Sequence, residues 1–107
     1  MSNTKTKKQQ EIRPRVAPRT DVPEPHLYKV VYINDEVTTV EFVVESLKSI
    51  FDMSEDQANE ITKKIHEEGS AVVAVYPYEL AEQKGVEVTI LARNNGFPLQ
   101  VKLEADI

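Results

Sequence analysis

Four residues between positions 34 and 38 carry the side chains best suited to chemistry: Asn34, Asp35, Glu36 and Thr38. Asn34, Asp35 and Glu36 follow a β-rich run, and Thr38 and Glu41 have the spacing of a capping box at a helix start. A strand is therefore predicted to end in a short acidic loop that leads directly into a helix. An amide and two carboxylates suit a ligand that donates several hydrogen bonds, such as an ammonium group. The alternative is a plain polar turn, because Asn and Asp are common turn residues.

A histidine further along the chain is a second candidate. His66 lies one turn after Thr62, near the end of the second predicted helix. If the first two helices pack together, they would wall a small cavity with Asn34 and His66 at its rim. The residues expected in this wall are Val40, Val43, Thr62 and Ile65. The alternative is a surface histidine whose charged form interacts favourably with the dipole at the helix C-terminus.

The chain lacks the residues that several classes of chemistry need. The chain has no cysteine and two histidines, so we expect no metal site and no cofactor. Its three glycines form no phosphate-binding loop, and no nucleophile accompanies His66 in a catalytic pattern. No run of about 18 apolar residues is present, so we predict no membrane span.

Charge and composition divide the chain into two parts. Residues 1–26 carry six basic and three acidic side chains, whereas residues 27–107 carry seven basic and fifteen acidic ones. The acidic second part argues against nucleic-acid binding. The first part holds four of the six prolines and few large apolar residues, so it cannot bury enough surface to fold. We predict a disordered N-terminal extension over 1–26 and one domain over 27–107.

Apolar periodicity predicts six elements in the second part. In chain order these are strand 27–33, helix 39–51, helix 54–68, strand 71–76, helix 77–93 and strand 99–104. The continuous apolar run at 71–76 is typical of a central strand. The order β-α-α-β-α-β predicts a small α/β (α+β) sandwich, in which a three-stranded sheet carries its helices on one face.

Local signals set the predicted helix ends. Ser54 and Gln57 have capping-box spacing, and Gly69 is placed to end the second helix as a left-handed cap. Pro77 is predicted as the first residue of the third helix. The predicted buried residues of that helix are Leu80, Ala81, Val88, Leu91 and Ala92.

The residues that carry a family resemblance are the run YKVVYINDE, followed by TTVEFV, His66 and GSAVVAV. Through them the chain resembles the ClpS family of bacterial protease adaptors. The resemblance extends from about residue 27 to residue 104, so it covers nearly the whole predicted domain. It includes Tyr28, Lys29, Val30, Asn34, Asp35, Thr38, Glu41, Phe42, Val43, His66, Gly69, Glu79, Ala81, Lys84, Ala92, Arg93, Pro98, Leu99, Leu103 and Glu104.

This resemblance implies an adaptor without catalytic activity. Such an adaptor binds N-degron proteins that begin with Leu, Phe, Tyr or Trp, and hands them to the ClpA unfoldase for degradation by ClpP. It also implies a monomer in the bacterial cytoplasm. The residues implied to bind the substrate α-amino group are Asn34, Asp35, Glu36 and His66. The implied hydrophobic pocket comprises Thr38, Val40, Val43, Thr62, Ile65 and Leu99. Glu79 and Lys84 fall where the family meets the N-terminal domain of ClpA. Residues 1–26 match the N-terminal extension that, in this family, engages the unfoldase in delivery.

Three positions depart from the family pattern. Glu36 replaces the usual aspartate, and Val40 and Thr62 stand where methionine is common.

Two other interpretations of the residues stay open. A ribosome-associated structural domain of similar fold would not need Asn34 and His66 together, and a small hydrolase using His66 and Glu36 would lack a nucleophile.

Overall fold

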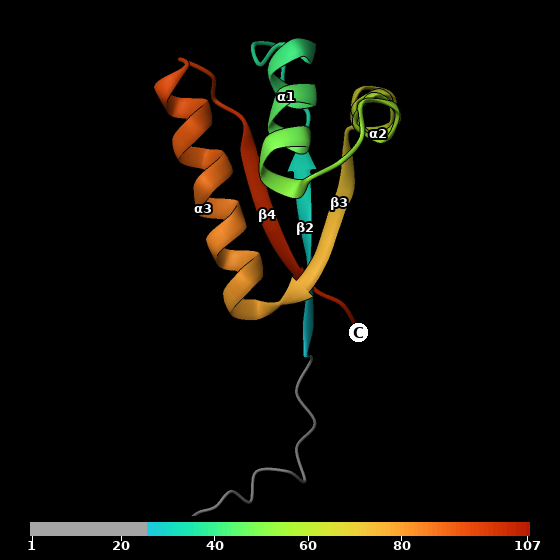
Figure 1. The fold of residues 1–107 in the computed structure, drawn as a ribbon, viewed down its shortest axis with the longest axis vertical. Coiled ribbons are helices and arrows are strands. Elements are labelled where there is room, and N and C mark those ends of the chain that lie inside the picture. The colour runs from blue at the N-terminus through green and yellow to red at the C-terminus, as the bar shows by residue number, and fades with distance from the viewer. Residues whose placement is uncertain (1–25) are drawn as a thin grey trace, which may run out of the picture.

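Residues 26–107 are the part of the chain that this computed structural model describes. Their elements follow the predicted order β-α-α-β-α-β (Figure 1). They are β2 (Leu27–Ile33), α1 (Val40–Phe51), α2 (Glu55–Glu68), β3 (Ser70–Pro77), α3 (Tyr78–Asn94) and β4 (Gln100–Ala105). The extension predicted to be disordered lies outside the described residues, apart from His26. No helix among residues 26–107 is long and apolar enough to cross a membrane.

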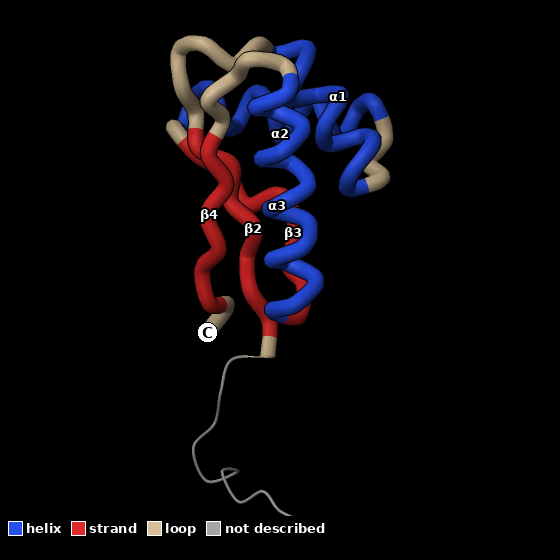
Figure 2. Tube along the Cα trace, turned by 90° about the vertical axis from the view of Figure 1, so that its left-hand side faces the viewer, coloured by secondary structure: helices blue, strands red, loops and turns tan. Residues whose placement is uncertain are grey.

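The sheet has three strands in the order β3-β2-β4, and both pairings are antiparallel. The helices pack on one side of it, as predicted (Figure 2). The prediction that 71–76 forms the central strand is wrong, because β2 is central and β3 is an edge. Val73 is 6% exposed on β3, but its neighbour Val72 is 41% exposed. The apolar run therefore covers a buried face and an open one, which a continuous pattern does not distinguish.

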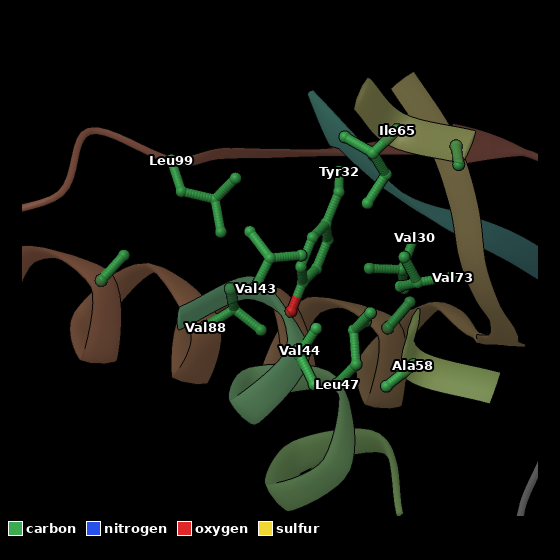
Figure 3. Packing of buried hydrophobic residues seen from close by; sticks show 13 residues of the cluster. Val30, Tyr32, Val43, Val44, Leu47, Ala58, Ile65, Val73, Val88 and Leu99 are labelled. Carbon is green, nitrogen blue, oxygen red and sulfur yellow. The ribbon is translucent and has the colours of Figure 1, made fainter. Parts of the chain in front are cut away.

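The core lies between the sheet and the helices and is centred on β2 (Figure 3). Val30 and Tyr32 point into it from β2, and Leu47 of α1 is fully buried against them. The Tyr32 hydroxyl lies 2.7 Å from Ser46 Oγ, which itself donates to the Val43 carbonyl oxygen at 2.9 Å. The buried phenol therefore has a partner on α1, and burial raises the pKa of Tyr32 above its ordinary value.

Two of the predicted helix ends are confirmed. Ser54 and Gln57 form a reciprocal capping box at the start of α2. Gly69 ends α2 with φ 91°, and its N–H donates to the Ile65 carbonyl oxygen at 2.9 Å. A left-handed backbone is strained for any residue with a Cβ, so glycine suits this cap.

Other predicted helix details are wrong. Thr39, not Thr38, caps α1 by accepting from the Phe42 N–H. Pro77 ends β3 with ψ 154°, and α3 begins one residue later. Leu80 is 37% exposed rather than buried. Of the other four predicted core positions in α3, Ala81, Val88 and Ala92 are buried, whereas Leu91 is half-buried.

Candidate functional site

A pocket of about 250 Å³ lies between the loop after β2, the start of α1 and the second half of α2. It is lined by Asn34, Asp35, Glu36, Thr38, Val40, Val43, Thr62, Ile65 and His66. The structure therefore brings together every residue that the sequence suggested for the acidic loop, the apolar wall and the histidine. Leu99 is absent from this lining and is buried in the core with 1% exposure.

Asp35 organises the loop that forms one side of the pocket. Its Oδ1 accepts hydrogen bonds from the backbone N–H groups of Val37 at 2.8 Å and Thr38 at 2.7 Å. Its Oδ2 accepts from the Thr38 hydroxyl at 2.8 Å. Both carboxylate oxygens thus fix the turn, and Thr38 serves this turn rather than the helix cap predicted for it.

The environment of Asp35 favours its charged form. Burial alone would raise its pKa, but the hydrogen bonds from Thr38 and Val37 and the charge of Arg93 outweigh it and lower the pKa below its ordinary value. The Arg93 side chain is held by the loop before β4, where its Nη1 donates to the carbonyl oxygens of Phe97 and Leu99, at 3.0 and 2.8 Å. The loop therefore presents a stable negative charge beside the pocket.

One backbone hydrogen bond joins the loop to the end of α2. The Asn34 N–H donates to the Gly69 carbonyl oxygen at 2.9 Å. This bond holds the residue after β2 beside the last turn of α2, which carries His66. Asn34 and His66 consequently share one rim although they are far apart in the sequence, and both are exposed there with Glu36.

The wall of the pocket is mainly apolar and deeply buried. Val43, Thr62 and Ile65 are 7%, 6% and 3% exposed. Val40 is 56% exposed and stands at the mouth. The helical spacing explains this division, because Val40 and Val43 are one turn apart on α1 and Thr62 and Ile65 are one turn apart on α2.

Glu79 and Lys84 lie on α3, away from this pocket. Glu79 is exposed in the first turn. The Lys84 ammonium donates to the Ile50 carbonyl oxygen at 2.9 Å and so satisfies the end of α1. This second role of Lys84 has no local signal in the sequence, since its partner is 34 residues away.

Sequence reasoning also missed Arg93 as a positive charge that acts on Asp35. It touches the loop before β4 and lowers the pKa of Asp35, yet it stands 58 positions further along the chain. Only the folded arrangement of α3 and the loop after β2 brings the two together. Its place in the last turn of α3 would by itself indicate no more than a favourable helix-dipole interaction.

The fold and the pocket define a small α/β binding domain. Acceptors at the rim and apolar side chains in the wall suit a ligand with a cationic donor attached to a hydrophobic body. The chain's similarity to known proteins identifies the domain more closely. The sequence pattern of the ClpS family, described as ATP-dependent Clp protease adaptor protein ClpS, matches residues 23–102. The chain belongs to this family.

Individual relatives agree with this assignment. The ATP-dependent Clp protease adapter protein ClpS of Nautilia profundicola is 49% identical over 80 residues, which cover 75% of this chain and 82% of that protein. The corresponding protein of Treponema denticola is 43% identical over 81 residues, covering 76% and 80%. The solved structure of Agrobacterium tumefaciens ClpS2 bound to L-phenylalaninamide superposes with a TM-score of 0.75 at 43% identity, covering 78% of this chain and all of that one.

Proposed function

We propose that this chain is an adaptor for N-degron substrates. It binds a protein through the free α-amino group and a bulky hydrophobic first residue (Leu, Phe, Tyr or Trp), and it delivers that protein to the ClpA unfoldase for degradation by ClpP. The observation that carries the proposal is the meeting of Asn34 and His66 at the rim of a pocket whose wall is apolar.

The rim suits an α-ammonium group. An ammonium has three donors and no acceptor, and it loses water when it enters a pocket. The Asn34 amide oxygen, the Glu36 carboxylate and an unprotonated His66 nitrogen are acceptors at this rim. Asp35 contributes mainly its negative charge, because its oxygens already accept three hydrogen bonds from the loop. Each charged hydrogen bond contributes roughly 1.5–3 kcal/mol.

The wall suits the first side chain. Burying a leucine or phenylalanine side chain against Val43 and Ile65 contributes roughly 1.5–3 kcal/mol. The bound L-phenylalaninamide of the Agrobacterium relative joins a free amino group to a benzyl side chain, which is the combination proposed here. Binding and release of such a residue need no chemical step, so we infer no enzymatic activity.

Delivery requires surfaces away from the pocket. We assign Glu79 and Lys84 on α3 to the contact with the N-terminal domain of ClpA, which leaves the pocket free to hold substrate. One chain forms the whole pocket, so a monomer suffices for binding. We place the protein in the bacterial cytoplasm, where these partners would meet it.

Substitutions at the rim test the proposal. Asn34→Ala and His66→Ala should each weaken binding of a fluorescent peptide that begins with Phe by at least about tenfold, because a buried charged donor is left without its acceptor. The matched control is Asn59→Ala, an exposed residue of α2 outside the pocket. Parent-like affinity in both rim variants would overturn the assignment of the ammonium site.

A further inference from the structure

Thr62 has a hydroxyl group that the fold leaves without a partner. Its side chain lines the pocket and is 6% exposed. Within residues 26–107, its Oγ1 is enclosed and makes no hydrogen bond. An unpaired buried hydroxyl is unfavourable, and most buried polar side chains have a partner. This feature is therefore a candidate for a contact that forms with the ligand.

The position of Thr62 relates it to a particular part of the ligand. It precedes His66 by four residues on α2, which corresponds to about 6 Å along the helix axis. With the α-ammonium held at the rim beside His66, the first side chain extends along α2 towards Thr62. The reach from the α-carbon to the far end of an aromatic ring is comparable with this separation.

The hydroxyl can turn towards such a ligand. Threonine in a helix divides between two χ1 rotamers, one of which lets its hydroxyl bond to a carbonyl in the preceding turn. Thr62 makes no such bond, so none has to break when its side chain rotates. A rotation of about 120° moves the hydroxyl into the position of the methyl group, and the methyl group into that of the hydrogen atom on Cβ.

We propose that Thr62 makes this pocket favour a first residue with a hydrogen-bonding group at its far end, tyrosine in particular, over a phenylalanine of the same shape. This inference rests on the proposed function, since it requires the first residue of a substrate to occupy the pocket. The phenolic hydroxyl of tyrosine both donates and accepts, so it pairs with a threonine hydroxyl in either direction. Valine in place of Thr62 would keep the shape and remove the partner.

The test is a double-mutant cycle on the full chain. Four peptides differ only in the first residue, which is Phe, Tyr, 4-methylphenylalanine or N-acetylated Phe, and their affinities are measured for the parent, Thr62→Val and Thr62→Ser. The 4-methyl group matches the phenolic hydroxyl in size without hydrogen bonding. We expect the Tyr-to-Phe affinity ratio to fall by about three- to tenfold in Thr62→Val, as for loss of one hydrogen bond. Thr62→Ser should keep the parent ratio.

The outcomes separate this inference from the proposed function. An unchanged Tyr-to-Phe ratio in Thr62→Val, with the Phe peptide still bound and its acetylated form rejected, would overturn the role of Thr62 alone. A Tyr preference matched by 4-methylphenylalanine would also overturn it, because shape would then explain the preference. Equal binding of free and acetylated Phe peptides would instead overturn the proposed function. Thermal unfolding confirms folding, and Thr62→Val should unfold at or above the parent temperature because it removes an unpaired hydroxyl.

Discussion

At the scale of single residues, adjacent residues of the acidic loop have different roles. Asp35 uses both carboxylate oxygens to hold Val37 and Thr38 in the turn. Asn34 and Glu36 on either side of it are exposed at the rim of the pocket. One carboxylate therefore shapes the loop while its neighbours are available to a ligand. Replacement of Asp35 is expected to disturb the whole rim, not one contact.

The lowered pKa of Asp35 gives a pH-dependent prediction. Because the folded-state pKa lies below the ordinary value of about 3.9, the charged carboxylate stabilises the fold above that value. This contribution is lost as the pH falls through the folded-state pKa. Asp35→Asn should therefore lose less stability than the parent when thermal unfolding is followed from about pH 5 to pH 3. Asp106→Asn, an exposed carboxylate near the C-terminus, is the control. Identical acid profiles for Asp35→Asn and the parent would contradict the assignment.

At the scale of the elements, the end of α2 positions the rim. Gly69 closes the helix in a left-handed conformation, and its carbonyl oxygen accepts the Asn34 N–H. The same residue thus ends the helix that carries His66 and anchors the loop that carries Asn34. Any distortion at this cap is transmitted to both acceptors.

Substitution of this glycine tests the link between the cap and the pocket. Gly69→Ala should destabilise the fold by about 1 kcal/mol in urea unfolding, through backbone strain alone, because no atom beyond the adjacent residues lies within 4 Å of the added Cβ. It should also weaken binding of a Phe-initiated peptide. Gly96→Ala is a matched control, since Gly96 also has a positive φ of 78° but follows α3 and makes no hydrogen bond to Asn34. If both variants bound the peptide equally well, the cap would not control the rim.

The same elements show what the sequence can and cannot predict. Helical stripes and the Ser54 capping box identified α1 and α2, because these signals are local. The choice between Thr38 and Thr39 as the cap of α1 was ambiguous because the two threonines are adjacent, and in the structure Asp35 engages Thr38 while Thr39 caps the helix. The central place of β2 and the effect of the Arg93 charge on Asp35 depend on tertiary packing. Helical spacing predicted the pocket wall and its rim on the condition that the two helices pack together, and the resemblance supplied the roles of these residues.

At the scale of the whole molecule, the pocket occupies one end of a single sheet-and-helix domain. It draws on the loop after β2, the start of α1 and the second half of α2, and it uses no residue before Asn34. Glu79 and Lys84 lie on a different helix. Substrate binding and delivery are therefore separable in the proposed function.

Removal of the N-terminal segment tests this separation. Deletion of residues 1–22 should leave the affinity for a Phe-initiated peptide unchanged, because every pocket residue is retained. The same deletion should slow degradation of a Phe-initiated protein by ClpA and ClpP, since the resemblance assigns delivery to this extension. Loss of peptide binding, or degradation at the parent rate, would show that the two activities do not divide in this way.

The central claim is that the pocket recognises a free α-amino group joined to a hydrophobic side chain. The most direct test is a fluorescence titration of the full chain with a Phe-initiated peptide and with the same peptide acetylated at its N-terminus. Acetylation removes the charge and two donors while it keeps the side chain, so affinity should fall by at least about tenfold. Equal affinity for the two peptides would contradict the account.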